Sequence, residues 1–332
     1  YLLAVLLLQV AMLFITKSWQ ALCVAASTVV AVELAEASEL FTRKRHIFNW
    51  LQALRVGIII GLLLPESYPP LMAFWITLIV VLICKRLLGG DVNTWVNPAA
   101  LAVAVCWLSC MQVFPQFSLT EELLQTKNAS LSFIQSGAVP VLAYDSPCTA
   151  FFNKTVYRFF DVTIPDGYLS LLWDSGAAIP AFRFNLLTLL SSMVLIAATV
   201  IQPLIPAVQL VVYLLLVRFI SPLFYGGVFG QGDMLLALCT SGTLFCTLFL
   251  LQWVGTPPLT RWGKFFYGVI AGIFSFLIVG CGDSPSGFIF TVLVMNVVSP
   301  LLQGIEAIAT DRYVQNVLIP RSEALQKDGI HA

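Results

Sequence analysis

The series of apolar runs in this sequence does most to restrict its fold. Ten runs occur, at residues 1–16, 19–38, 52–64, 69–85, 97–114, 185–202, 206–222, 234–254, 265–281 and 286–303. A helix crosses the hydrocarbon core of a bilayer with about 20 apolar residues, and most of the runs approach that length. Only 10% of the residues are charged, whereas soluble domains carry about a quarter. We therefore expect an all-α integral membrane protein with about ten transmembrane helices.

The distribution of lysine and arginine predicts how these helices are oriented. If the N-terminus lies in the cytoplasm, 11 of the 17 basic residues fall in inside loops or in the C-terminal tail, and 6 fall outside. Cytoplasmic loops of membrane proteins carry such an excess of basic residues. Both termini are therefore predicted to be cytoplasmic. The run at 52–64 is short and is followed by three prolines within six residues, which predicts a broken or tilted span.

A long connection divides the ten runs into five and five. We expect a first five-helix repeat at 1–114, an extracytoplasmic loop at 115–184, a second five-helix repeat at 185–304 and a cytoplasmic tail at 305–332. Because five is odd, the two halves would run in opposite senses across the membrane. Gly90-Asp91 and Gly282-Asp283 precede the fifth and tenth runs at equivalent positions, as in inverted repeats that build a site near the midplane. The semi-apolar parts of the loop are expected to pack on the outer membrane surface.

Two asparagines before the fifth helix are candidate ligand-binding residues. Asn93 and Asn97 are four residues apart, so their amides would project from one face of a helix. Pro98 frees a backbone carbonyl, and the glycines at 89 and 90 let a ligand approach the main chain. Ordinary capping of the helix start is the alternative explanation.

Three acidic residues are candidates for an ion path. Asp233 follows four glycines and begins the eighth run, which makes it the acid expected at membrane depth. Close helix packing or a helix broken around a ligand would each explain those glycines. Glu33 and Glu36 lie at the inner end of the second run, just ahead of the basic residues at 43–45. A surface ion-pair network is the alternative explanation for this pair.

Charge, cysteine and histidine content exclude several function classes. The net charge is zero, so the basic surface that nucleic acids require is absent. The eight cysteines lie mostly in apolar runs, without a C-x-x-C pair, which indicates small buried hydrophobic residues and no metal site. Both histidines, His46 and His331, fall in predicted cytoplasmic segments without a placed nucleophile. No serine-histidine-acid catalytic set is therefore expected.

Several motifs together carry a resemblance to a known family. They are Gly89-Gly90 through Asn97-Pro98-Ala99-Ala100, Asp174-Ser175-Gly176-Ala177, Thr256-Pro257-Pro258-Leu259-Thr260 to Gly263-Lys264, and Gly282-Asp283 to Gly287 followed by Met295-Asn296 and Pro300. In these motifs and their order, over nearly the whole chain, the sequence resembles the RnfD/NqrB family. This family comprises the RnfD component of the Rnf ferredoxin–NAD oxidoreductase and the related NqrB component of the sodium-pumping NADH–quinone reductase. The length of the chain favours the Rnf component.

The resemblance implies a fold, partners and a cofactor. The fold would be a urea-transporter-like inverted repeat of ten helices, in a six-subunit redox pump of the bacterial inner membrane that moves sodium ions or protons. The partners would be the other membrane subunits and the lipid bilayer. In the family, an FMN phosphate is esterified to a threonine in an outer-side Ser-Gly-Ala-Thr motif, and riboflavin is held among the helices of at least the NqrB component. The candidate flavin-binding residues are therefore Asp174, Ser175, Gly176, Ala177, Ala178 and Arg183.

This sequence departs from the family pattern at Ala178, which occupies the position of the threonine. Because alanine has no hydroxyl, no phosphoester can form there. FMN would then bind without a covalent bond, the flavin would be lost, or Ser175 would take the place of the threonine. Trp173, Phe182 and Phe184 would wall the flavin ring and Arg183 would attract its phosphate. Anchoring of the sixth helix at the membrane interface is the alternative role of these aromatic residues.

We therefore expect a membrane subunit of an ion-translocating electron-transport complex. It would carry electrons through bound flavin between ferredoxin or NAD and partner subunits, without being catalytic alone. The electron-transfer role follows from the resemblance only, because one scaffold can host many functions. The alternatives are a channel or transporter for a small polar solute on the same scaffold, and a structural subunit that has lost its cofactor.

Overall fold

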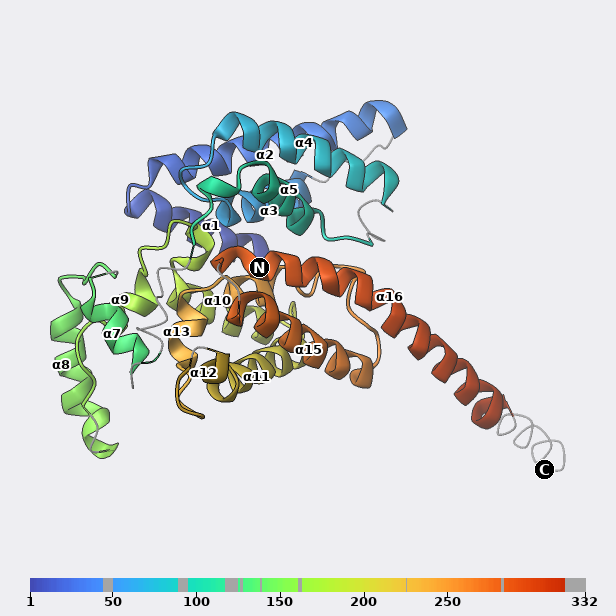
Figure 1. The fold of residues 1–332 in the computed structure, drawn as a ribbon. Coiled ribbons are helices and arrows are strands. Elements are labelled where there is room, and N and C mark those ends of the chain that lie inside the picture. The colour runs from blue at the N-terminus through green and yellow to red at the C-terminus, as the bar shows by residue number, and fades with distance from the viewer. Residues whose placement is uncertain are drawn as a thin grey trace.

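The described part of the chain consists of helices, turns and loops. The computed structural model describes residues 1–43, 50–88, 95–116, 125, 128–137, 139–160, 163–224, 226–281 and 284–319, and within these ranges no strand occurs. Helices α1–α5 form one layer and α10–α16 form a second layer beside it (Figure 1). The segment between the halves lies at one end of these layers, and the C-terminal part of α16 projects from the opposite end.

The first half is organised around α2. It consists of α1 (Leu2–Ile15), α2 (Trp19–Arg43), α3 (Trp50–Leu63), α4 (Pro70–Leu87) and α5 (Pro98–Ser109). Helix α2 packs against α3 and α4, and α4 packs against α5. Gly57 and Gly61 of α3 let the two backbones approach, since a Cβ on Gly61 would lie 2.5 Å from the Cα of Ala25. Small residues at this spacing are a common means of close packing between membrane helices.

The second half repeats this order of packing with one broken helix. It consists of α10 (Asn185–Ala197), α11 (Leu204–Phe219), α12 (Ser221–Phe224), α13 (Met234–Cys239), α14 (Thr243–Phe249), α15 (Arg261–Ser275) and α16 (Phe288–Tyr313). Helix α11 packs on α15, and α15 on α16, as α2 packs on α4, and α4 on α5. The eighth apolar run, expected as one span, is two short helices separated at Ser241–Gly242.

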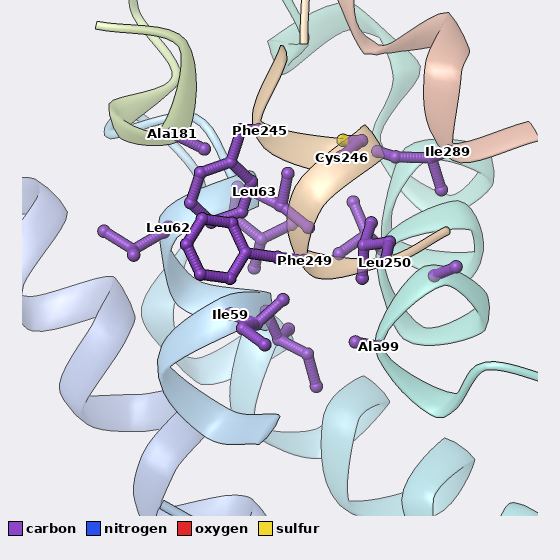
Figure 2. Close-up of a cluster of buried hydrophobic side chains, with 14 of the residues drawn as sticks. Ile59, Leu62, Leu63, Ala99, Ala181, Phe245, Cys246, Phe249, Leu250 and Ile289 are labelled. Atoms are coloured by element: carbon purple, nitrogen blue, oxygen red, sulfur yellow. The ribbon is translucent and has the colours of Figure 1, made fainter. Parts of the chain in front are cut away.

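Helix α14 joins the two halves. All seven of its residues are buried, and the core cluster that contains the five apolar ones also includes residues of α3, α5 and α16. Figure 2 shows Phe245 and Phe249 beside Leu62 and Leu63 of α3. The rings of Phe245 and Phe249 are 4.5 Å apart. A continuous apolar core therefore crosses from one half to the other.

The outer segment between the halves contains three short helices, α7 (Ala129–Gln135), α8 (Asp145–Thr155) and α9 (Tyr168–Trp173). Phe133 and Ile134 of α7 and Leu171 of α9 are buried in one cluster with Leu236 of α13. The expected contact of these semi-apolar stretches with the membrane surface stays a prediction, and parts of both stretches pack on protein. The reason is that α13 offers them an apolar face, which the sequence alone did not place.

Four helices are long and apolar enough to cross a membrane, among the residues that the structure describes. They are Trp19–Ser38, Pro70–Leu87, Arg261–Gly280 and Pro285–Asn316. Helices α1, α3, α5, α10 and α11 are apolar but have only 12 to 16 residues. This architecture agrees with the predicted all-helical membrane class, and the ten-span inverted repeat stays a prediction.

Candidate functional site

The loop between α9 and α10 is closed by an ion pair. The guanidinium of Arg183 donates to both carboxylate oxygens of Asp174, at 2.6 Å from Nε and 3.0 Å from Nη2. Its Nη1 donates to Ser18 Oγ in the α1–α2 turn at 2.9 Å. A bidentate pair of this kind fixes direction as well as charge. It therefore fixes the loop to the first half of the protein.

The predicted Ser-Gly-Ala element forms the turn inside this loop. Gly176 has a φ of +68°, a conformation that glycine adopts without strain, and its N–H donates to Asp174 Oδ1 at 3.0 Å. Ser175 is tied twice across the loop, because its N–H donates to the carbonyl of Arg183 and its hydroxyl to the carbonyl of Phe182. The backbone of the element is thus held in a single shape.

Ala177 and Ala178 lie at the edge of a small cavity. Its volume is about 220 Å³, and Ser175, Gly176, Ile179 and Phe182 complete the part of its wall that this loop supplies. The remaining wall comes from other elements, namely Pro115, Gln116, Phe133, Thr240 and Pro285. The carbonyl of Ala178 accepts a hydrogen bond from the N–H of Glu66 at 3.0 Å. The cavity therefore lies where the outer segment meets both halves.

The break between α13 and α14 makes room for an aromatic wall. A Cβ on Gly242 would lie 2.3 Å from the ring of Phe182, so the ring sits directly on the glycine backbone. The N–H of Gly242 donates to the carbonyl of Pro285 at 3.2 Å. Phe184 is buried elsewhere, under the guanidinium of Arg183. Of the three aromatic residues expected to wall a ring, Phe182 is the one that lines the cavity among the described residues.

Asn97 acts as a helix cap and as a link between the halves. Its Oδ1 accepts from the N–H groups of Ala99 and Ala100, and its Nδ2 donates to the carbonyl of Leu250 at 3.1 Å. The side chain is fully buried. The Asn97 side chain therefore has the geometry of a helix N-cap, which was the alternative explanation for this residue. Asn93, the other predicted amide, lies outside the described residues, as do Gly90-Asp91 and Gly282-Asp283.

Asp233 caps two helices at once. Its Oδ1 accepts from the N–H groups of Leu235 and Leu236 at the start of α13. Its Oδ2 accepts from the N–H and the hydroxyl of Ser130 in the first turn of α7. Negative charge is favoured at helix N-termini. The acid predicted at membrane depth thus ties the outer segment to α13, beside a cavity of about 360 Å³.

Glu33 and Glu36 differ in their surroundings in the C-terminal half of α2. Glu36 is buried and forms an ion pair with Lys85 near the end of α4, whereas Glu33 is only half-buried. The pair links α2 to α4 and is buried, so it is a structural ion pair but not the surface network given as the alternative explanation. An ion path through these acids stays a prediction. Within the described ranges, no cluster of three or more His, Cys, Asp or Glu side chains is arranged to hold a metal.

Known proteins match this chain over almost its whole length. The pattern of the NQR2, RnfD, RnfE family matches residues 1–310. The chain belongs to this family. Among its relatives, the D component of the "Ion-translocating oxidoreductase complex" of Salmonella arizonae is 26% identical over 311 residues, covering 86% of this chain and 85% of the relative. Proteins with the same name from Klebsiella pneumoniae and Vibrio cholerae are each 25% identical, over 80% and 82% of both chains.

The cavity fits the ring of the flavin that the resemblance implies better than it fits a phosphate. Phe133, Phe182 and the two prolines give apolar walls, which suit a flat aromatic ring. At about 220 Å³ it is smaller than the roughly 300–1,000 Å³ of common ligand pockets, so it would enclose a ring rather than a whole nucleotide. Arg183 is committed to Asp174, and Ala178 has no hydroxyl. A phosphate anchored on residue 178 therefore does not fit this member of the NQR2, RnfD, RnfE family.

Several residues of this region were not identified from the sequence. Phe133 and Pro285 come from segments far from Ala178 along the chain, and only the fold brings them to the cavity. Thr240, directly after α13, is a third wall residue of this kind. The usable signal was the Ser241-Gly242 pair inside an apolar run, because a glycine there allows a helix to break.

Asp145 is a second buried acid of the outer segment that the sequence did not single out. Its carboxylate accepts from the N–H groups of Gly167 and Ser170 and from the hydroxyls of Thr149 and Ser170. Burial alone would raise the pKa of Asp145, but these hydrogen bonds to the charged form outweigh it and the pKa lies below its ordinary value. The ionised carboxylate therefore holds α8 and α9 together.

Proposed function

We propose that this protein is a membrane subunit of an ion-translocating oxidoreductase complex of the Rnf type. It carries electrons through bound flavin between ferredoxin or NAD and the partner subunits. The family match over residues 1–310 and the printed names of the relatives support the complex and its chemistry. The partners are then the other membrane subunits, and the transported ion is sodium or a proton.

The observation that carries the flavin assignment is the cavity between the outer segment and the second half. It is formed by the Ser175–Ile179 element that the sequence singled out, with further walls from α7 and from Thr240 and Pro285 of the second half. Phe182 and Phe133 provide the faces for a planar ring, and the hydrogen bond from Ser175 to the carbonyl of Phe182 helps to fix the position of Phe182. A bound flavin would supply one- and two-electron transfer. FMN without a covalent bond, or riboflavin, is the form that Ala178 permits.

The scaffold supports an inverted repeat of five plus five helices. The packing order α2–α4–α5 recurs as α11–α15–α16, and the cavity lies between the outer segment and the second half, with Glu66 of the first half bonded to the carbonyl of Ala178. Inverted repeats of membrane proteins build their sites at the interface of the repeats from broken helices. In this arrangement the outer segment is extracytoplasmic and both termini are cytoplasmic, in a bacterial inner membrane.

The first test measures flavin in the purified subunit. We expect acid or solvent to release flavin, identified by chromatography, and we expect no fluorescent protein band in a denaturing gel. A fluorescent band would show a covalent link and contradict the role of Ala178. Absence of flavin from both fractions, in protein purified with its partner subunits, would overturn the electron-carrier assignment.

A substitution tests the assignment of residue 178 more sharply. Ala178→Thr restores the hydroxyl of the family motif, and Ala177→Thr places the same side chain one residue away as a matched control. In a host that attaches FMN to family members, we expect a fluorescent band for Ala178→Thr and none for Ala177→Thr. Equal labelling of both variants, or of neither, would show that residue 178 does not occupy the flavin position.

One observation favours the transporter alternative. A larger cavity of about 660 Å³ lies among α11, α15 and α16, and its wall includes the polar residues Gln202, Gln252, Gln303 and Lys264. Such a surface suits a small polar solute better than a flavin ring. Uptake of radiolabelled solutes into proteoliposomes tests this function. Solute flux by flavin-free protein would favour it over electron transfer.

A further inference from the structure

Helix α8 of the outer segment has its polar side turned towards the protein. Asp145, Thr149 and Asn153 are spaced four residues apart, so they share one face of the helix. Asp145 bonds to Gly167, Ser170 and Thr149, and the amide of Asn153 pairs with both the N–H and the carbonyl of Ile164. The 164–170 segment therefore holds α8 by its polar face.

The other side of α8 and the turn that follows it is aromatic and exposed. The exposed fraction is 62% for Phe151 and 88% for Phe159. Phe152 and Val156 beside them are also exposed. A helix that faces water on its free side normally presents polar residues there. The arrangement is the reverse of that pattern, so the free side of α8 is suited to an apolar surrounding.

Two basic residues accompany the aromatic side chains. Lys154 and Arg158 are both exposed and lie four residues apart, next to Phe151 and Phe159. The acid of this helix, Asp145, is buried on the opposite face and fully engaged. Long basic side chains can lay their stems on apolar surface and keep their charges at the level of anionic headgroups. Charge and apolar surface thus occur together on one face.

Helix α8 lies at one end of the molecule (Figure 1). In Figure 1, α8 runs across the direction of α2, α4 and α16, and it lies at the end of the molecule opposite the projecting C-terminal part of α16. If α2, α4 and α16 span the membrane, α8 is parallel to the membrane plane at its outer surface. Interfacial helices lie in this orientation, with aromatic residues in the boundary between headgroups and acyl chains.

We infer that α8 and the turn after it, residues 145–159, dock on the outer leaflet of the membrane. Phe151 and Phe159 enter the boundary region, and Lys154 and Arg158 bind the headgroups of anionic phospholipids. The outer segment is then held from two sides, by protein at α7 and α9 and by lipid at α8. This contact is independent of the flavin, because none of these four residues lines the cavity at Ala178.

Photocrosslinking in the intact protein tests this contact. A benzophenone amino acid replaces Phe151 or Phe159 in the full chain, in native membranes that contain the whole complex, and mass spectrometry identifies the adducts. The matched control carries the label at Ser146, an exposed residue in the first turn of α8. A label at Leu71, an exposed residue of α4, shows that lipid adducts are detected.

We expect phospholipid adducts at Phe151, Phe159 and Leu71, with several-fold lower yield at Ser146. Crosslinks from Phe151 and Phe159 to another polypeptide would overturn the inference and identify the face as a subunit interface. If Phe151 and Phe159 give no adducts while Leu71 gives lipid adducts, α8 lies in water, and this result would also overturn the inference. In nanodiscs, Lys154→Glu with Arg158→Glu should lower the adduct yield in phosphatidylglycerol but not in phosphatidylcholine. An unchanged adduct yield of the double variant in phosphatidylglycerol would contradict the role of the two cations.

Discussion

The two halves share an order of helix packing but are held together by different chemistry. In the first half, a buried ion pair between Glu36 and Lys85 links α2 to α4. At the corresponding contact of the second half, Gln209 of α11 bonds to Ser275 of α15 and to Thr247 of α14. An ion pair (the charged tie) thus links α2 to α4, and neutral hydrogen bonds of Gln209 (the neutral tie) link α11 to α15.

The halves also place their closely packed glycines on different helices. In the first half, Gly57 and Gly61 lie on α3 and face α2, whereas in the second half Gly268 and Gly272 lie on α15 and face α11. Helix α3 is continuous, while its counterpart is broken into α13 and α14. In the first half, the close backbone approach therefore involves the continuous helix α3. In the second half, the corresponding helix is interrupted between α13 and α14, and the ring of Phe182 packs on Gly242 at the interruption. This difference places the candidate site on the side of the second half.

The largest expected effect comes from breaking the charged tie. Lys85→Met leaves the buried carboxylate of Glu36 without this cation, which we expect to cost about 3 kcal/mol of stability. The double variant with Glu36→Gln should recover most of that loss, because no buried charge remains. Thermal unfolding of the purified protein in detergent measures both. A single variant as stable as the wild type would show that the ion pair does not tie α2 to α4.

The second prediction compares the glycine contacts of the two halves. Gly61→Ala brings a Cβ to 2.5 Å from backbone of α2, whereas Gly272→Ala brings one to 2.7 Å from the side chain of Val212. The Cβ of Val212 is itself fixed to the backbone, so both substitutions require the helices to shift, but the overlap is larger at Gly61. We therefore expect a loss of about 2 kcal/mol for Gly61→Ala and less for Gly272→Ala.

Gly304→Ala is the control for these two variants, because a Cβ there would meet no atom within 4 Å. Its stability should equal or slightly exceed that of the wild type, since alanine favours the helix. The comparison is made by thermal unfolding in the same detergent. A larger loss for Gly272→Ala than for Gly61→Ala would reverse the order of tightness inferred for the halves.

The third prediction concerns the neutral tie. Gln209→Leu removes the acceptor of Thr247 and the donor to Ser275, so we expect a loss of about 1 kcal/mol, smaller than for Lys85→Met. Denaturant unfolding in detergent gives both values on one scale. Equal losses would mean that the charged and neutral ties contribute alike.

The smallest effect is expected in the outer segment and depends on pH. Because the pKa of Asp145 lies below its ordinary value in the folded protein, its ionised form stabilises α8 and α9 above the ordinary carboxyl pKa. That stability should be lost as the pH falls below about 4. Hydrogen exchange, corrected for intrinsic rates, should show α8 opening in acid while α2 and α4 stay protected. In Asp145→Asn the opening should no longer depend on pH, and an unchanged acid transition there would assign it to another group.

Part of the candidate site could be predicted from the sequence because it is local. The Asp174-Ser175-Gly176 turn is built from neighbouring residues, and the conformation of Gly176 follows from its residue type. Capping by Asn97 and Asp233 is likewise a local property of a polar residue before an apolar run. The second partners of these caps, Leu250 and Ser130, could not be predicted, because they are more than 100 residues away in the chain.

The sequence by itself determined the membrane class of this protein, the family and the absence of a hydroxyl at residue 178, and it predicted a division at the long connection. These follow from composition, hydropathy and motifs, which act within one segment at a time. Only the tertiary structure decided that the eighth run breaks, that Phe182 sits on Gly242, and that Arg183 is committed to Asp174. Each of these depends on close contact between segments whose approach is set by packing of the whole core, and no local pattern specifies such a contact.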